Sequence, residues 1–432
     1  YLVFRLPVDN LIFGFGGTLL VLTGLAMLAA IGMLGLLKAL APVTGRMFGY
    51  LGRMAPRNLI NALSRTSVAV AALMVAVAVT IGVSLMINSF RYTVSVWLEQ
   101  TLQGDIYITA PSFTANQSLV EIDPAVYQQV SDWPGVKRVD LLRSTQVNSP
   151  YGDLQLSATN NLNIGLERIF KEIKIPKEDV YAAMQQGGVL LTEPLANRLG
   201  LQVGDNFEMN TPSGTQPFPI VGVYYDYSSS QGFVMMEREV YREHWKDAAI
   251  TAMALRLPPG ADSDQLTEDL IAGIRSEQNL IIRPNQALRR DVMEVFDRTF
   301  AITAALRILA TMVAFIGVLS TLLLLQLEKQ REIGILKALG LSGRELWKLV
   351  MLETGLMGLI AGLLAAPTGY ILSLILIRVI NLRSFGWTLQ LSAQPGAFLF
   401  SIAIALAAAL LAGFLPAWRL SRMAAADAIR FE

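Results

Sequence analysis

Residues 66–90 read TSVAVAALMVAVAVTIGVSLMINSF, a run of 25 residues without a charged side chain between Arg65 and Arg91. A helix of about 20 apolar residues is long enough to cross the hydrocarbon core of a bilayer. Buried helices of soluble proteins rarely extend over 25 residues without a charge. Four further runs are similarly apolar: 11–37, 308–327 (beginning near 300 if Arg307 extends to the interface), 349–377 and 396–415. The sequence therefore predicts an α-helical transmembrane bundle of five spans.

The composition of the 432-residue chain supports a membrane protein. Hydrophobic residues make up 53% and charged residues 16%, against about 25% charged residues in a typical soluble domain, and the mean hydropathy is +0.46. The net charge of +1 conceals two unlike parts. Residues 91–298 hold 18 Lys and Arg and 27 Asp and Glu, whereas the remainder holds 17 and 7. An acidic, water-soluble domain is thus joined to a basic, apolar part, which excludes a disordered chain and a nucleic-acid binder acting through overall charge.

Lys and Arg in the short connecting segments predict the orientation, because these residues are enriched on the cytoplasmic side. Residues 38–65 carry five basic residues and no acid, the segment between the third and fourth spans carries five basic residues, and the tail after Trp418 carries three. We expect all three segments in the cytoplasm. The acidic domain then lies on the other, extracytoplasmic side of the membrane.

These observations divide the chain into ten segments. In order, they are an extra transmembrane helix (1–40), a basic cytoplasmic linker (41–65), a transmembrane helix (66–90), an extracytoplasmic α+β domain with helical stalks (91–298), a transmembrane helix (299–327), a cytoplasmic helix (328–348), a transmembrane helix (349–378), an extracytoplasmic loop (379–395), a transmembrane helix (396–418) and a cytoplasmic tail (419–432).

The pattern of the acidic domain is that of mixed strands and helices. Residues 105–109 alternate between polar and apolar as a half-buried strand does, and residues 187–192 and 218–224 have the pattern of further strands. Residues 193–199 are typical of a short helix that Gly200 ends. Residues 262–278 are typical of a polar amphipathic helix. The charged, helical pattern of 285–300, and that of 91–103, predicts helical stalks that extend the neighbouring spans.

No catalytic or metal-binding signature is visible in this domain. The chain contains no cysteine, which excludes a disulfide framework, a thiolate metal site and a cysteine nucleophile. One histidine, His244, cannot supply a catalytic triad of the usual kind or a site with several His ligands, and we interpret it as a solvated helix residue. The 27 acids are interpreted as a solvated surface. Residues 224–227 (Tyr-Tyr-Asp-Tyr) are interpreted as a strand end leading into a loop, with a ligand edge as the alternative.

The stretch 327–340, LEKQREIGILKALG, predicts an amphipathic cytoplasmic helix directly before the fourth span. Its apolar residues recur at spacings of three and four, which gives one apolar face. Gly340 suits a left-handed helix stop, and Ser342 followed by Glu345 predicts a capping box for the next helix. Two interpretations stay open on geometry alone: a helix that rests on the lipid surface, or a lever docked in a soluble partner.

Residues 328–340 resemble the signature of the FtsX-like permeases, the membrane subunits of mechanotransmission ABC transporters of the macrolide-exporter and lipoprotein-release type. The resemblance extends over about residues 55–432, including the run from Val189 to Val223 and the end from Pro416 to Arg430. It implies that the helix docks in a separate cytoplasmic ABC ATPase, expected as a dimer. The implied ATPase-coupling residues are Glu328, Lys329, Arg331, Glu332, Gly334, Leu336, Lys337 and Gly340.

The chain lacks the Gly-x-x-x-x-Gly-Lys-Ser/Thr phosphate loop. The resemblance therefore implies a non-catalytic subunit that binds no cofactor itself, with ATP and Mg on the partner ATPase. The extra span 11–37 departs from the four-span module of the family. It suggests the C-terminal half of a two-module permease of about ten spans, with a second permease half or a periplasmic accessory protein as a further partner.

The remaining alternatives are an ion- or proton-coupled transporter and a membrane-anchored hydrolase. The ionisable residues that we identify within the spans are Arg307, near the outer end of its span, and Glu353, near the inner end. Proton and ion relays tend to lie nearer the midplane, so these positions disfavour the transporter alternative. Arg307 is interpreted as extending to the interface, and Glu353 as holding helices together or contacting the coupling region. Gly355, Gly358 and Gly362 suit close helix packing. The sequence does not identify the substrate.

Overall fold

The computed structural model describes residues 11–111, 119–274, 278–302 and 340–422, and the isolated positions 305, 308–309, 312, 316, 319–320 and 335. The chain forms two compact units. We call the unit made of Tyr1–Phe90, Thr299–Arg383 and Leu389–Glu432 the membrane unit, and the unit made of Arg91–Arg298 and Ser384–Thr388 the extracytoplasmic unit. The names follow the predicted location of each.

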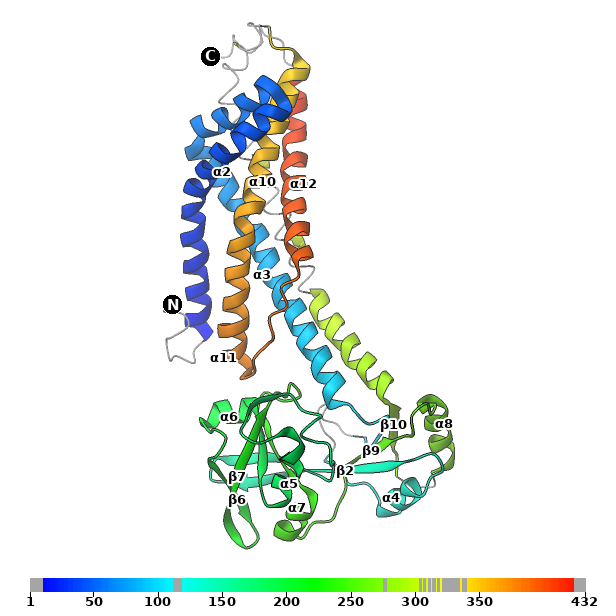
Figure 1. Cartoon of the computed structure of the whole chain (residues 1–432). Helices are drawn as coiled ribbons and strands as arrows, with labels where there is room; N and C mark the ends of the chain where they lie inside the picture. Colours follow the sequence, from blue (N-terminus) through cyan, green and yellow to red (C-terminus); the bar gives the residue numbers. More distant parts are fainter. Residues whose placement is uncertain are drawn as a thin grey trace. The chain divides into compact units, whose positions relative to one another are not determined.

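Four helices in the described part of the chain are long and apolar enough to cross a membrane. They are α2 (Leu11–Asn61), α3 (Leu63–Thr101), α10 (Gly343–Ile375) with its continuation, and α12 (Pro395–Arg422). The continuation of α10 is the π-helix η2 (Leu376–Asn381) and α11 (Leu382–Phe385). Figure 1 shows α10 between α2 and α12, both of which it contacts. The predicted span 299–327 lies mostly outside the described residues, so the count of five spans stays a prediction.

The core of the membrane unit consists of apolar side chains from all four helices. Met33 of α2, Met74 and Ile81 of α3, Ile360 of α10 and Ala405 of α12 are at most 1% exposed and belong to one cluster. Because lipid is as apolar as these side chains, burial against lipid gives little driving force, and close packing must hold such helices together.

α2 folds back on itself at Gly49. This residue has φ +63° and ψ −134°, so it separates a long helix from a short one that ends at Asn61. After the turn, the Thr44 hydroxyl donates a hydrogen bond to the carbonyl oxygen of Gly52 at 2.7 Å. A Cβ at Gly52 would lie 1.9 Å from the backbone carbonyl oxygen of Thr44, so the close approach of the two backbones requires glycine. Residues 41–65, predicted as a basic linker, are thus helical apart from short breaks.

The extracytoplasmic unit is built on a mixed sheet. In the described residues its order is β10-β1-β9-β2-β3-β8-β5-β7-β4, with β6 paired to β7. Neighbouring strands are antiparallel except β3 with β8 and β5 with β7. The strands are β1 Ile106–Thr109, β2 Arg138–Ser149, β3 Gly152–Thr159, β4 Phe170–Ile173, β5 Val189–Thr192, β6 Asn206–Thr211, β7 Gly214–Tyr224, β8 Phe233–Glu237, β9 Ala252–Arg256 and β10 Ile281–Pro284.

Helices cover both faces of this sheet around β8. Val234 and Met236 of β8 pack in a cluster with residues of α6 (Glu193–Leu199) and α7 (Arg238–Trp245). Phe233 and Met235 pack in another cluster, with residues of α5 (Val180–Gln185). Because successive strand residues point to opposite faces, burial on both faces explains why β8 reads as a continuous apolar run. α4 (Pro124–Ser131) and α8 (Ser263–Gly273) pack with β1 and β9 at the other end, as Figure 1 shows.

Several local predictions for this unit are confirmed. The predicted strands at 105–109, 187–192 and 218–224 correspond to β1, β5 and the end of β7. The helix predicted at 193–199 is α6, and Gly200 ends it with φ +69°. The predicted helix 262–278 corresponds to the shorter α8. The chain is also helical over 285–302 and in the extension of α3 to Thr101, as the stalk prediction requires. These elements carry strong local patterns, which explains the agreement.

Candidate functional site

The stretch predicted to couple with an ATPase lies mostly outside the described residues. This applies to Glu328, Lys329, Arg331, Glu332, Gly334, Leu336 and Lys337, and also to Arg307 in the third span. Gly340 is described and has φ +105°, a conformation that favours glycine. The coupling role of all these residues stays a prediction.

The helix that follows the coupling stretch begins with the predicted capping box. The Glu345 backbone N–H donates to Ser342 Oγ at 3.3 Å, and the Ser342 backbone N–H donates to Glu345 Oε2 at 2.9 Å. Two donors that would otherwise have no partner in the first turn are satisfied reciprocally. This cap makes a fixed start of α10 immediately after the coupling stretch.

The short helix that ends α2 is bound to the first turns of α10. The Tyr50 hydroxyl donates to Glu345 Oε1, and Asn58 Nδ2 donates to Glu353 Oε1 at 2.7 Å. The two pairs have the same sequence separation of 295 residues, so the two helices run parallel in constant register. Glu353 is 9% exposed. This hydrogen bond links the end of α2 to α10 at Glu353, and the choice between the two roles expected for Glu353 stays a prediction.

Three glycines of α10 allow close contact with α12. A Cβ at Gly358 would lie 2.5 Å from the Cβ of Ala409 and 2.9 Å from the carbonyl oxygen of Ala405. A Cβ at Gly362 would lie 3.1 Å from the Cα of Ile402, and one at Gly355 would lie 3.3 Å from Leu410. The predicted close packing at these glycines is confirmed, and it ties α12 to the same helix that starts after the coupling stretch.

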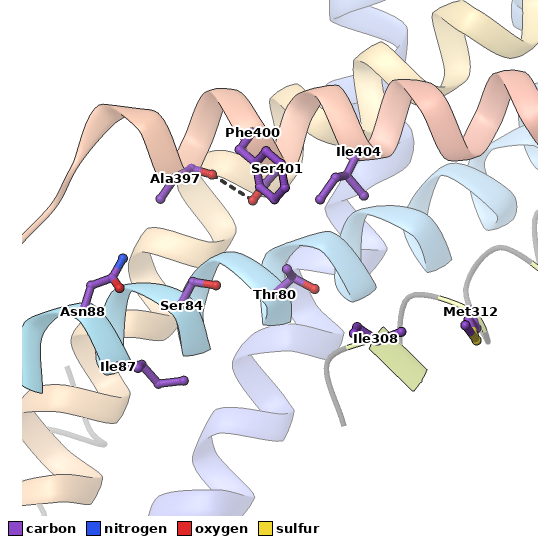
Figure 2. Close-up of a pocket in the computed structure, with 10 residues that line it drawn as sticks. All are labelled: Thr80, Ser84, Ile87, Asn88, Ile308, Met312, Ala397, Phe400, Ser401 and Ile404. Carbon is purple, nitrogen blue, oxygen red and sulfur yellow. Dashed lines mark hydrogen bonds between the residues drawn. The ribbon is translucent and has the colours of Figure 1, made fainter. Parts of the chain in front are cut away.

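A cavity of about 480 Å³ lies between α3, α12 and the described part of the third predicted span. Figure 2 shows Thr80, Ser84 and Asn88 along α3, at spacings of four residues, with Ser401 on α12. The remaining lining is apolar, from Ile87, Ile308, Met312, Ala397, Phe400 and Ile404. The described lining residues carry no charge.

A second, smaller cavity of about 110 Å³ lies in the extracytoplasmic unit and contains a charge network. Arg256 Nε donates to Asp140 Oδ2 at 2.6 Å, and Arg256 Nη2 donates to Glu167 Oε2 at 2.8 Å. Arg168 also lines the cavity, so two cations face two anions. Burial raises the pKa of the neighbouring Tyr107 to about 12, which keeps it protonated near neutral pH. Arg256 thus binds both carboxylates, as in a structural network. Arg168 donates instead to the Glu167 backbone carbonyl at 2.9 Å, and its buried Nε has no hydrogen-bond partner among the described residues.

The single histidine, His244, lies in helix α7, as predicted, and is partly exposed. Its ring lies edge-on to Phe218, with centroids 5.1 Å apart, and its centroid is 6.0 Å from that of Trp245. The end of α7 thus packs against β7. In the part of the chain that the structure describes, no group of three or more His, Asp or Glu side chains could hold a metal ion. Four predicted surface acids are buried, namely Asp140, Glu193, Asp226 and Glu237.

Two family models match the chain in sequence order. The MacB-like periplasmic core domain matches residues 66–272, and the FtsX-like permease C-terminal domain matches residues 304–425. The first match ends near the end of α8, and the second covers α10 and α12 together with the predicted coupling stretch.

Three relatives illustrate the similarity. The chain is 42% identical over 435 residues to the uncharacterized ABC transporter permease protein Rv0987 of Mycobacterium tuberculosis, covering 100% of this chain and 51% of the relative. It is 24% identical over 277 residues to the lipoprotein-releasing system transmembrane protein LolC of Xylella fastidiosa, covering 56% of this chain and 65% of the relative. It is 26% identical over 216 residues to the macrolide export ATP-binding/permease protein MacB of Escherichia coli, covering 49% of this chain and 31% of the relative. The chain thus spans about half the length of the first relative.

Proposed function

We propose that the chain, which matches the FtsX-like permease and MacB-like periplasmic core models, transmits ATP hydrolysis on a separate ATPase subunit to its extracytoplasmic domain. That movement would export, extract or release a substrate on the outer side of a bacterial inner membrane. One observation carries the proposal: the two family models match in order, with the acidic domain between apolar helices. The proposed partners are a cytoplasmic ABC ATPase, as a dimer, the lipid bilayer, and a second permease half or periplasmic accessory protein.

The geometry at the start of α10 supports transmission from the cytoplasmic side. A displacement of the coupling stretch would act on the capped first turn at Ser342 and Glu345. Hydrogen bonds from Tyr50 and Asn58 would carry it to the end of α2, and the glycine contacts would carry it to α12. Packed helices shift as units because their cores have little free volume. In this proposal the coupling residues Glu328 to Gly340 bind the ATPase, and ATP with Mg stays on that partner.

The alternative of an ion- or proton-coupled transporter receives no support from the described cavity. Proton and ion pathways through membranes depend on ionisable residues at membrane depth. The described residues that line the 480 Å³ cavity have hydroxyl, amide and apolar side chains. Glu353 is bound to Asn58 near the inner end of α10. These features favour helix association over ion conduction as the role of the polar groups.

The proposal is tested by co-purification from membranes. Charge reversal of the coupling stretch (Glu328→Lys, Arg331→Glu and Glu332→Lys together) should abolish retention of the ATPase while the chain still inserts in the membrane. The matched control is Arg46→Glu, an exposed basic residue of α2 on the same predicted side, which should keep the ATPase. Stoichiometric co-purification with the triple variant would contradict the assignment of the coupling stretch.

A further inference from the structure

The segment Ser384–Thr388 belongs to the extracytoplasmic unit, although the chain before and after it belongs to the membrane unit. It connects the end of α11 to the residues that lead into α12. Short loops between spans normally lie in solvent, since an exposed backbone is satisfied by water. This segment instead contacts the rest of the extracytoplasmic unit through three separate groups of atoms.

The first contact is with the fully buried side chain of Glu193, at the first turn of α6. The Thr388 backbone N–H donates to Glu193 Oε2 at 2.8 Å, and the Thr388 hydroxyl donates to Oε1 at 2.7 Å. Lys171 Nζ lies 3.2 Å from Oε1 as a cationic partner. A buried carboxylate is tolerated only with such partners. If the segment moved away from the unit, the buried Glu193 carboxylate would lose both the backbone N–H and the hydroxyl of Thr388 as hydrogen-bond donors.

The second contact involves the next turn of α6. Asn197 Nδ2 donates to the carbonyl oxygen of Gly386 at 2.8 Å, and Lys171 Nζ donates to Asn197 Oδ1 at 2.7 Å. Lys171 thus contacts both side chains that hold the segment. Gly386 has φ +73°, in the left-handed region, and a Cβ there would lie 3.5 Å from the Cβ of Pro194. The backbone of the segment therefore lies directly against α6.

The third contact is aromatic. The Trp387 ring lies edge-on to Tyr227 with centroids 5.7 Å apart, and the Tyr227 hydroxyl donates to the carbonyl oxygen of Thr388 at 2.9 Å. Tyr227 also lies edge-on to Trp97 of α3 at 5.9 Å. Burial, and then the nearby charge of Glu193, raise the pKa of Tyr227 far above its ordinary value. Tyr227 therefore stays protonated and keeps donating this hydrogen bond.

We propose that Ser384–Thr388 is a strap that stays bound to the extracytoplasmic unit, and that Glu193 is the positioning residue that holds it. Motion of α10 and α12 would reach the unit through this strap, in addition to the path along α3. The inference rests on the proposed function for its role in transmission, although binding of the strap itself does not. Charge-assisted hydrogen bonds in a buried site make release costly.

A disulfide tests whether the strap is bound, independently of any ATPase. The chain has no native cysteine, and the 3.5 Å between Cβ positions at residues 194 and 386 falls in the range of disulfides. Pro194→Cys with Gly386→Cys in the full-length chain in native membranes should become cross-linked upon mild oxidation. The single variants control for strain at the positive φ of Gly386. Absence of the cross-link, with both cysteines accessible to alkylation after unfolding, would overturn the proposal.

The same pair tests transmission in the complex with the co-purified ATPase. The readout is the nucleotide-dependent change in hydrogen exchange of residues 91–298. With the disulfide closed, this change should persist, because the strap stays bound throughout. Loss of the change upon closure, and its return upon reduction, would show that the strap must be released and would overturn the proposal. If no ATPase co-purifies with the unmodified chain, the proposed function fails while the cross-linking result still decides whether the strap is bound.

Loosening the strap provides the opposite test. Thr388→Val removes one hydrogen bond to Glu193, and Trp387→Ala removes the aromatic contact; both lie in the strap, so the domain should still fold. Cross-linking of the 194–386 pair should slow by about tenfold in Thr388→Val, the factor expected from losing one charge-assisted hydrogen bond. It should also slow in Trp387→Ala, by a smaller factor, because an aromatic contact is lost. Thr215→Val is the matched control, because its exposed hydroxyl donates to Asn210 outside the strap. Equal cross-linking rates in all variants would contradict the role of these contacts.

Discussion

Glu193 and Glu345 are two carboxylates with the same kind of task and different surroundings. Each lies in the first turn of a helix, and each accepts a hydrogen bond from a residue far away in sequence, Thr388 and Tyr50 respectively. Glu193 is fully buried, whereas Glu345 is partly exposed and is also bound by its own cap, Ser342. Water can replace a lost partner at Glu345 but not at Glu193. Burial, not the hydrogen bond itself, should therefore decide what each contact contributes.

The largest effect is expected at the buried carboxylate. Glu193→Ala removes the acceptor of two Thr388 hydrogen bonds and the partner of Lys171. We expect the free energy of unfolding of the extracytoplasmic unit to fall by about 3 kcal/mol, as for other broken buried polar networks. Denaturant unfolding of the purified chain, followed by tryptophan fluorescence, measures this. Glu172→Ala, at an acid of β4 whose side chain is 40% exposed, is the control. Equal effects of the two variants would show that burial does not set the contribution.

The stability of the membrane unit should depend on close helix packing, whereas that of the extracytoplasmic unit depends on buried polar contacts. Gly358→Ala places a Cβ 2.5 Å from the Cβ of Ala409, and this overpacking should destabilise the α10–α12 contact by about 2 kcal/mol. Thermal unfolding in detergent checks the effect. Gly24→Ala in α2 is the control, because among the described residues nothing beyond its chain neighbours and the backbone of its own helix lies within 4 Å of the added Cβ. A Gly358→Ala protein as stable as the Gly24→Ala protein would remove close packing as the basis of this contact.

Asp247 provides an intermediate case with a pH signature. Burial alone would raise its pKa, but the Ala249 backbone N–H, the Tyr241 hydroxyl and the Arg143 guanidinium together lower it. Because the pKa is lower in the folded state, the stabilisation is fully present above the ordinary value near 4. It is then lost as the pH falls through the lowered folded value.

The variant Asp247→Asn should be less stable by about 1.5 kcal/mol at neutral pH. Unfolding measured between about pH 5 and pH 2 should show a smaller loss of stability upon acidification than in the unchanged chain. Asp264→Asn, at an exposed acid, controls for general charge effects. An unchanged acid dependence in Asp247→Asn would assign the effect to other groups.

The sequence predicts the elements that hold Glu193 but not its role. Strand β5, helix α6 and the stop at Gly200 follow from local alternation and from the turn preferences of glycine. The partner of Glu193 is Thr388, 195 residues further along the chain, and no local pattern reports such a distance. By composition, Glu193 is one of the many acids interpreted as solvated surface. The contact of His244 with Phe218 has no sequence signal for the same reason, since Phe218 lies on another element.

The membrane unit shows the same limit of local patterns. Apolar runs predict the helices, and the spacing of Gly355, Gly358 and Gly362 predicts a close contact, although it does not identify α12 as the neighbour. The pairs of Tyr50 with Glu345 and of Asn58 with Glu353 have no sequence signal, because their only regularity is a shared separation of 295 residues. That regularity becomes visible once the helices are seen to run parallel.

The smallest effect on stability is expected at Glu345, the partly exposed carboxylate. Tyr50→Phe removes one hydrogen bond to Glu345, which keeps the reciprocal cap with Ser342, so α10 should still begin at the same residue. We expect a shift in the unfolding temperature smaller than that of Asn58→Leu, which leaves the buried Glu353 without this donor. Hydrogen exchange of residues 50–61 in detergent should rise more in Asn58→Leu than in Tyr50→Phe. If Tyr50→Phe destabilises the chain as much as Glu193→Ala, water does not replace the lost partner at Glu345, and the contrast between the two carboxylates has another cause.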